Sequence, residues 1–172
     1  MKRTDTSCEM DTTYTTLTGR RFDLAQLSAD ERGFLSDVLA LFQRQPRWEA
    51  FSRAWLALGR ERLWHDATMP VGSPVYRICQ DLATRLGVRE GRVARPDYRD
   101  RLVDLIEERY GSRYRFCKET GIDPGHLSRV LAGKKHFAAE TLFRILDALG
   151  AELTIIDRAQ ADQLPPAVAL AR

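Results

Sequence analysis

The sequence predicts a mainly all-α protein, in which an N-terminal helical domain precedes a second domain of four to five helices with a short C-terminal strand. Three observations support this fold class. Apolar residues recur three and four positions apart through most of the chain, which is the period of an amphipathic helix. Serine, aspartate, proline and glycine stand where such helices begin and end. Only two short segments, 17–24 and 151–157, are suited to extended structure.

Composition divides the 172 residues into four parts. Residues 1–17 are rich in threonine and lack apolar periodicity, so we expect a flexible arm. Residues 18–95 have apolar residues of their own and predict a helical domain that binds a partner protein or dimerises. Residues 96–157 form the second domain with its strand, which needs another strand edge to pair with. Residues 158–172 are expected to form a flexible tail.

Three helices are predicted in the N-terminal domain. The first begins at Ser28, which forms a capping box with the glutamate three residues later, and it ends before Pro46. The second covers Trp48–Trp64, and the stripe of aromatic residues along it is typical of a core rather than of a base-stacking surface. The third begins at Pro74 and ends at Gly87.

The segment from Tyr98 to Gly150 has the clearest helix boundaries in the chain. Start and stop residues there predict four helices, over residues 98–110, 113–120, 123–132 and 138–149.

The connection between the second and third of these helices is the most informative part of the sequence. Gly121 permits the positive φ of a tight turn, and Ile122 faces the core. Asp123 and Pro124 are an N-cap and a first helical residue. Cys117 provides a small side chain where the two helices meet at a steep angle. This arrangement leaves one face of the third helix buried and the other free to enter a major groove.

These residues resemble the Cro/CI-type helix-turn-helix family (XRE type). The resemblance is nearly continuous over Arg113–Lys135 and Glu140–Gly150, and it covers about a third of the chain. It implies a DNA-binding domain whose recognition helix is Asp123–Ala132. The positions that it places toward the groove are Pro124, Gly125, His126, Ser128 and Arg129.

The resemblance assigns base readout mainly to Arg129, whose guanidinium matches the acceptor edge of guanine. His126 and Ser128 are expected to contact bases or phosphates. Pro124 and Gly125 depart from the family, which often has long polar side chains at these positions. Specificity is therefore expected to depend on Arg129, on His126 and on DNA shape.

Phosphate contacts are expected from residues on either side of this helix. Arg113 matches the phosphate-contacting position of the family, and Lys134 and Lys135 add contacts that position the DNA without specifying its sequence. The charge pattern agrees with this role. Residues 97–108 contain five acids and two bases, a net charge of −3, whereas residues 109–135 contain seven bases and two acids, a net charge of +5.

An earlier segment has a similar spacing of a small residue and a glycine, at Gly87, but Gly91 and Pro96 interrupt the helix that should follow it. A helix end with a basic linker is the better interpretation. One hypothesis is that three linker arginines touch phosphates as auxiliary contacts: Arg89, Arg92 and Arg95.

The predicted function is a sequence-specific DNA-binding transcriptional regulator, a repressor, that binds double-stranded operator DNA as a homodimer. We expect it in the cytoplasm at the nucleoid, because no apolar run is long enough to span a membrane and the N-terminus lacks the core of a secretory signal. No cofactor and no metal are expected, since the cysteines and histidines lack zinc-ligand spacing.

Two alternatives keep the helix-turn-helix but change its role. In one, the protein is an antitoxin that binds a toxin-like partner through residues 18–95 and regulates its own operon. In the other, it is an interaction adaptor whose helix-turn-helix does not bind DNA. An enzyme is not expected, because residues 18–95 contain one histidine, His65, and no nucleophile motif. The adjacent Asp30 and Glu31 are explained by helix capping.

Overall fold

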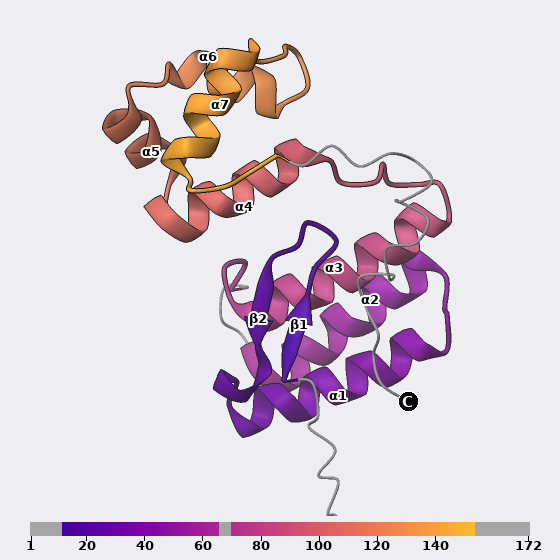
Figure 1. Ribbon diagram of the computed structural model, residues 1–172. Coiled ribbons are helices and arrows are strands. Elements are labelled where there is room, and N and C mark those ends of the chain that lie inside the picture. The colour runs from indigo at the N-terminus through magenta and orange to yellow at the C-terminus, as the bar shows by residue number, and fades with distance from the viewer. Residues whose placement is uncertain (1–11, 66–69, 154–172) are drawn as a thin grey trace, which may run out of the picture. The chain divides into compact units, whose positions relative to one another are not determined.

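The computed structural model describes residues 12–65 and 70–153, and this part of the chain is mainly helical, as predicted (Figure 1). It divides into two compact units between Arg95 and Pro96. The first unit contains a short hairpin and three α-helices, and the second contains four α-helices. No helix among these residues is long and apolar enough to span a membrane.

The hairpin of the first unit corrects the prediction of a flexible arm over residues 1–17. Residues 1–11 lie outside the described part of the chain, but strand β1 (Thr13–Thr15) pairs antiparallel with β2 (Arg21–Asp23), with Tyr14 opposite Phe22. Tyr14 is 3% exposed. The arm is ordered here because it has both a strand partner and a buried aromatic side chain. The extended segment predicted at 17–24 is confirmed over β2.

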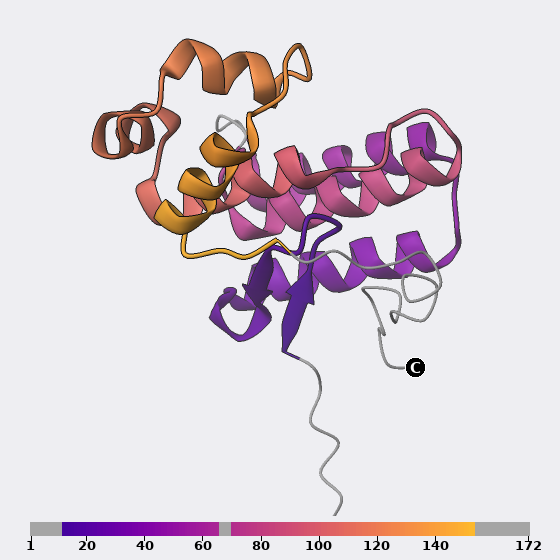
Figure 2. The same ribbon diagram turned by 45° about the horizontal axis from the view of Figure 1, so that its top comes forward.

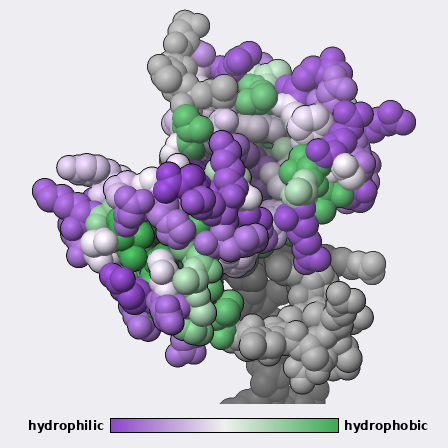
Figure 3. All heavy atoms as spheres, turned by 90° about the horizontal axis from the view of Figure 1, so that it is seen from above, coloured by the Kyte–Doolittle hydropathy of each residue, from purple (hydrophilic) through white to green (hydrophobic). Residues whose placement is uncertain are grey.

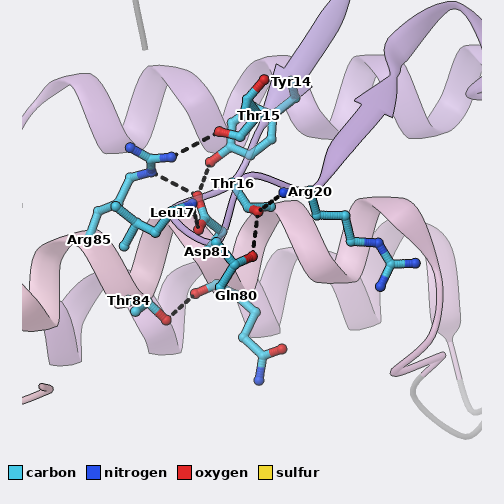
Figure 4. A network of polar contacts seen from close by, with 10 residues as sticks. Tyr14, Thr15, Thr16, Leu17, Arg20, Gln80, Asp81, Thr84 and Arg85 are labelled. Atoms are coloured by element: carbon cyan, nitrogen blue, oxygen red, sulfur yellow. Dashed lines mark hydrogen bonds and ion pairs between the residues drawn. The ribbon is translucent and has the colours of Figure 1, made fainter. Parts of the chain in front are cut away.

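A buried polar network joins this hairpin to the third helix (Figure 4). The carboxylate of Asp81 accepts hydrogen bonds from the Tyr14 hydroxyl at 2.5 Å, the Leu17 amide at 2.8 Å and Nε of Arg85 at 2.7 Å. Arg85 also donates to the Thr15 carbonyl at 3.0 Å. Burial and the neighbouring charge of Asp81 raise the pKa of Tyr14, which keeps its hydroxyl a donor. The buried carboxylate therefore has the partners that its desolvation requires.

Helix α1 (Ala29–Gln43) begins with the predicted capping box. The Ser28 hydroxyl accepts from the Glu31 amide at 3.2 Å, and the Glu31 carboxylate accepts from the Ser28 amide at 2.8 Å. A short 3₁₀ turn, η1 (Leu24–Gln26), leads into it. The helix stops before Pro46, as the sequence predicts.

The second predicted helix, Trp48–Trp64, consists of two parts. Helix α2 (Trp48–Gly59) gives way to a π-helix, η2 (Arg60–Trp64). The reason is the packing of Trp64. Its ring lies so close to Gly59 that a Cβ added there would be 2.3 Å from the nearest ring carbon. The ring then meets Trp55 edge to face, with centroids 6.1 Å apart. Residues 66–69, which follow η2, lie outside the described part.

Helix α3 (Pro74–Arg89) begins at Pro74, as predicted, and the hydroxyl of the preceding Ser73 accepts from the Tyr76 amide at 3.2 Å. The prediction that it ends at Gly87 is wrong by two residues. Gly87 lies buried inside the helix. A Cβ added there would be 2.7 Å from Val93 and 3.2 Å from Trp48. The absence of a side chain at Gly87 lets the side chains of Val93 and Trp48 pack against the helix backbone. Helices α1, α2 and α3 pack against one another around a common core, in which Phe34, Val38, Phe51, Ile78, Leu82 and Leu86 are buried.

The second unit contains α4 (Tyr98–Tyr110), α5 (Arg113–Thr120), α6 (Pro124–Leu131) and α7 (Ala139–Ala148) (Figure 2). The four predicted helices agree with these bounds to within a residue or two. Their shared core includes Leu102, Ile106, Phe116, Leu127, Ile145 and Leu149. The predicted strand at 151–157 is not formed over 151–153, and its remaining residues lie outside the described part, as does the predicted tail 158–172.

Candidate nucleic-acid interface

The candidate site is built on two short helices, α5 and α6, and the three-residue turn between them. Helix α5 begins at Ser112, whose hydroxyl accepts from the Arg115 amide at 3.2 Å. It ends at Gly121, which has a φ of 71° and donates its amide to the Cys117 carbonyl at 3.0 Å. A Cβ on Gly121 would meet nothing within 4 Å, so the positive φ alone accounts for the glycine.

The turn is held from the inside by apolar side chains. Phe116, Cys117 and Ile122 are at most 5% exposed, as the sequence predicts for Cys117 and Ile122. Burial, with the negative charge of Asp123 as a second cause, raises the pKa of Cys117, so this thiol acts as a small apolar side chain. Tyr110 packs edge to face on Phe116 at 5.0 Å.

Helix α6 begins with the predicted cap, in which the Asp123 carboxylate accepts from the His126 amide at 2.5 Å. Leu127 and Val130 are buried on its inner face. Pro124, Ser128 and Arg129 are exposed on its outer face, and Gly125 is half-buried. The helix thus presents a continuous outer face, one turn of which lacks long side chains.

Arg129 lies along this outer face rather than away from it. Its Nη2 is 3.9 Å from Oδ1 of Asp123, and half of the side chain is exposed. The guanidinium passes over Gly125, where an added Cβ would be 3.3 Å from Nη1 of Arg129 and 3.4 Å from Oδ1 of Asp123. A side chain at position 125 would therefore touch the guanidinium of Arg129 and shift it by a few tenths of an ångström. This relation could not be inferred from the sequence, which indicated only that Gly125 lacks a donor.

His126 is placed differently from the other predicted groove residues. It is half-buried, and its ring meets Phe137 edge to face with centroids 5.6 Å apart. Phe137 belongs to the connection between α6 and α7, so the imidazole helps to seat that connection on α6. Part of the ring's surface is thus used within the unit.

The predicted phosphate contacts lie at the ends of the two helices. Arg113 is the first residue of α5, and Lys134 and Lys135 follow α6; all three are exposed. Within the described residues, no ion pair involves them. The turn after α6 closes the helix, because Gly133 has a φ of 72° and the Lys134 amide donates to the Arg129 carbonyl at 2.9 Å.

One further side chain belongs to this surface. Tyr114 follows Arg113 and is 75% exposed, the most exposed aromatic residue among those described. Its hydroxyl can donate to a phosphate oxygen. The sequence contained a signal for it, since an aromatic residue at this position of a short amphipathic helix has no core to enter. By contrast, Arg115 is paired with Glu119 at 2.7 Å.

The electrostatics of the surface follow from these placements. The bases Arg113, Lys118, Arg129, Lys134 and Lys135 are all exposed on α5, α6 and the turn after α6. Figure 3 shows mostly hydrophilic side chains on the visible face of the described chain, with hydrophobic ones in small separate groups. This surface therefore presents several positive charges and one exposed helix face, which suit the binding of a polyanion.

Comparison with known proteins adds no relative: the chain matches no protein-family model, no curated protein and no solved structure.

Proposed function

We propose that this chain is a sequence-specific DNA-binding transcriptional regulator, a repressor with a helix-turn-helix of the Cro/CI type, which binds operator DNA as a homodimer in the cytoplasm. The observation that supports it best is the pair α5–α6. A left-handed Gly121 and an N-capping Asp123 join two eight-residue helices, and the second has one buried and one exposed face.

The exposed face of α6 has the chemistry for reading a base. Arg129 can turn from Asp123 to the O6 and N7 acceptors of guanine, because its contact with Asp123 is long and both side chains are at least half exposed. Arg113, Lys134 and Lys135 lie at the helix ends, where cations and amides meet phosphates. Tyr114 adds a neutral donor.

A homodimer follows from the small number of base-reading groups. One α6 offers Arg129 and Ser128 as exposed polar side chains, too few for a long site. Two copies double both the base contacts and the phosphate contacts, and they read half-sites about one helical turn apart.

The test begins with selection of a preferred site from genomic fragments, followed by affinities for that site and for random duplex at two salt concentrations. Replacing Arg129 by alanine should reduce the preference by about 5- to 150-fold, the equivalent of about 1–3 kcal/mol. Replacing Lys134 by glutamine should weaken binding to both duplexes equally and lower the salt slope by about 1 for each bound protomer. Arg53→Gln, at an exposed position of α2, is the matched control. If neither Arg129→Ala nor Lys134→Gln changes binding, the proposed docking is wrong.

A further inference from the structure

Five arginines gather at one end of the first unit. Two come from the connection between α1 and α2, and three from the end of α3 and the segment after it: Arg44, Arg47, Arg89, Arg92 and Arg95. All five are exposed. The two segments are adjacent, because Arg89 donates to the Pro46 carbonyl at 3.3 Å and the Trp48 amide donates to the Glu90 carboxylate at 2.7 Å (Figures 1 and 2). We call this cluster the arginine corner.

Part of the arginine corner is packed against the first unit. The guanidinium of Arg92 lies over the ring of Trp48, 5.9 Å from its centroid, and its Nε is 3.2 Å from Glu90. Behind it, Val93 and Trp48 close on Gly87, and the Val93 amide donates to the Gly87 carbonyl at 3.2 Å. The backbone of the basic segment is therefore tied to α3 as far as Val93.

The positive charge of the corner is largely uncompensated. Glu90 is the one acid in residues 44–47 and 89–95, which with five arginines gives a net charge of +4. Its carboxylate is already engaged by the Trp48 amide and by Arg92. Within the described residues, no ion pair joins Arg44, Arg47 or Arg95 to a carboxylate.

Helix stability explains only part of this arrangement. Arg44 and Arg89 lie at the C-terminal ends of α1 and α3, where a cation is favourable. Arg47 has the opposite position: it is the N-cap residue of α2, at the positive end of the helix, and its side chain makes no capping hydrogen bond. Glu90 takes over that capping. A residue that opposes local stability in this way is expected where a surface has a function.

We propose that the arginine corner binds the phosphodiester backbone of duplex DNA, as a second contact beside that of α5 and α6. The inference rests on the proposed function, which identifies DNA as the polyanion that is bound. Planar guanidinium groups suit phosphates, and such contacts add affinity at any sequence. Arg95 is three residues from Tyr98, the first residue of α4, so at most about 11 Å of chain separates them. This short connection keeps DNA that is bound by the second unit tethered to the unit that carries the corner.

The test removes three corner charges that form no ion pair in the described part of the chain, in the full-length variant Arg44→Gln/Arg47→Gln/Arg95→Gln. The control, Arg21→Gln/Arg53→Gln/Arg60→Gln, removes three exposed arginines elsewhere in the same unit. The probe is a fluorescein-labelled duplex of random sequence, roughly three helical turns long, titrated over a range of salt. The corner variant should lower the salt slope by about 2–3 for each bound protomer and weaken binding at least about tenfold, and the control should not. Thermal melts by circular dichroism should coincide for all three proteins.

Other results separate the two proposals. If the corner variant keeps the wild-type slope while Lys134→Gln/Lys135→Gln lowers it, the corner is not a DNA contact and the proposed function stands. If the corner variant lowers the slope while Arg129→Ala and Lys134→Gln/Lys135→Gln change nothing, the corner stands and the docking of α6 fails. Tighter DNA binding by the corner variant would overturn the inference, as would unchanged DNA binding with lost binding to phosphatidylglycerol vesicles.

Discussion

At the scale of single residues, Gly125 changes the interpretation of the α6 surface. It has no side chain to offer a base, yet the absence of a Cβ lets Arg129 lie closely over the helix toward Asp123. A guanidinium held in one region loses less conformational freedom when it binds than one that moves freely. Glycine and arginine four residues apart thus act as one feature, in which the small residue positions the large one.

Gly125→Ala tests this pairing. The added methyl group should displace Arg129 and lower the preference for the selected site, while alanine leaves stability unchanged or raises it by up to about 1 kcal/mol. Affinities for preferred and random duplex and a urea unfolding curve measure the two effects. Since Gly125 is expected to act through Arg129, the double variant Gly125→Ala/Arg129→Ala should match Arg129→Ala alone. A further loss in the double variant would contradict the pairing.

At the scale of elements, the junction of α2 and η2 is determined by one close contact. The ring of Trp64 lies against the backbone of Gly59 and packs edge to face on Phe34 at 5.9 Å as well as on Trp55. The change from α- to π-helical hydrogen bonding brings Trp64 back over the preceding turn. The π-helical segment therefore results from the packing of Trp64 and not from a low helix propensity of these residues.

Gly59→Ala should therefore destabilise the protein by about 1–3 kcal/mol, because neither the helix backbone nor the buried indole can move away freely. Gly33→Ala is the matched control: Gly33 lies in α1, an added Cβ there meets nothing within 4 Å, and alanine should stabilise by about 0.5–1 kcal/mol. Urea unfolding followed by tryptophan fluorescence compares them. Equal effects of the same sign would show that Trp64 does not require this glycine.

At the scale of the whole molecule, the two units are stabilised by different means. The second unit has an apolar core with helices closed by local caps and glycine turns. The first unit adds a buried ionic network centred on Asp81, whose partners Tyr14 and Arg85 lie on the hairpin and on α3. All three tryptophans lie in the first unit, so their fluorescence reports its unfolding separately.

Asp81→Asn should lower the stability of the first unit by about 3 kcal/mol, because it leaves the half-buried Arg85 without its counter-charge. The urea midpoint from tryptophan fluorescence should fall accordingly. Leu127→Ala, which empties part of the second core, should cost about 2–5 kcal/mol in that unit and leave the fluorescence midpoint in place, while circular dichroism shows the loss. If both variants shift both signals together, the two cores unfold as one.

The sequence by itself determined the helices of the second unit, because most of their boundaries are decided within four residues. Two polar side chains accept hydrogen bonds from nearby backbone amides at helix starts, those of Ser112 and Asp123. Three glycines adopt the positive φ that ends a helix: Gly111, Gly121 and Gly133. All eight predicted site residues accordingly lie on α5, on α6 or directly after α6.

Only the tertiary structure decided what depends on partners far along the chain. Tyr14 is ordered by Asp81, 67 residues away, and Trp48 is capped by Glu90, 42 residues away. The arginine corner joins the same two segments that Trp48 and Glu90 connect. Even within the candidate site, the contact of His126 with Phe137 depends on how the chain returns after α6. Local hydrogen-bond geometry is encoded in neighbouring residues, whereas burial and charge clustering appear only when distant segments meet.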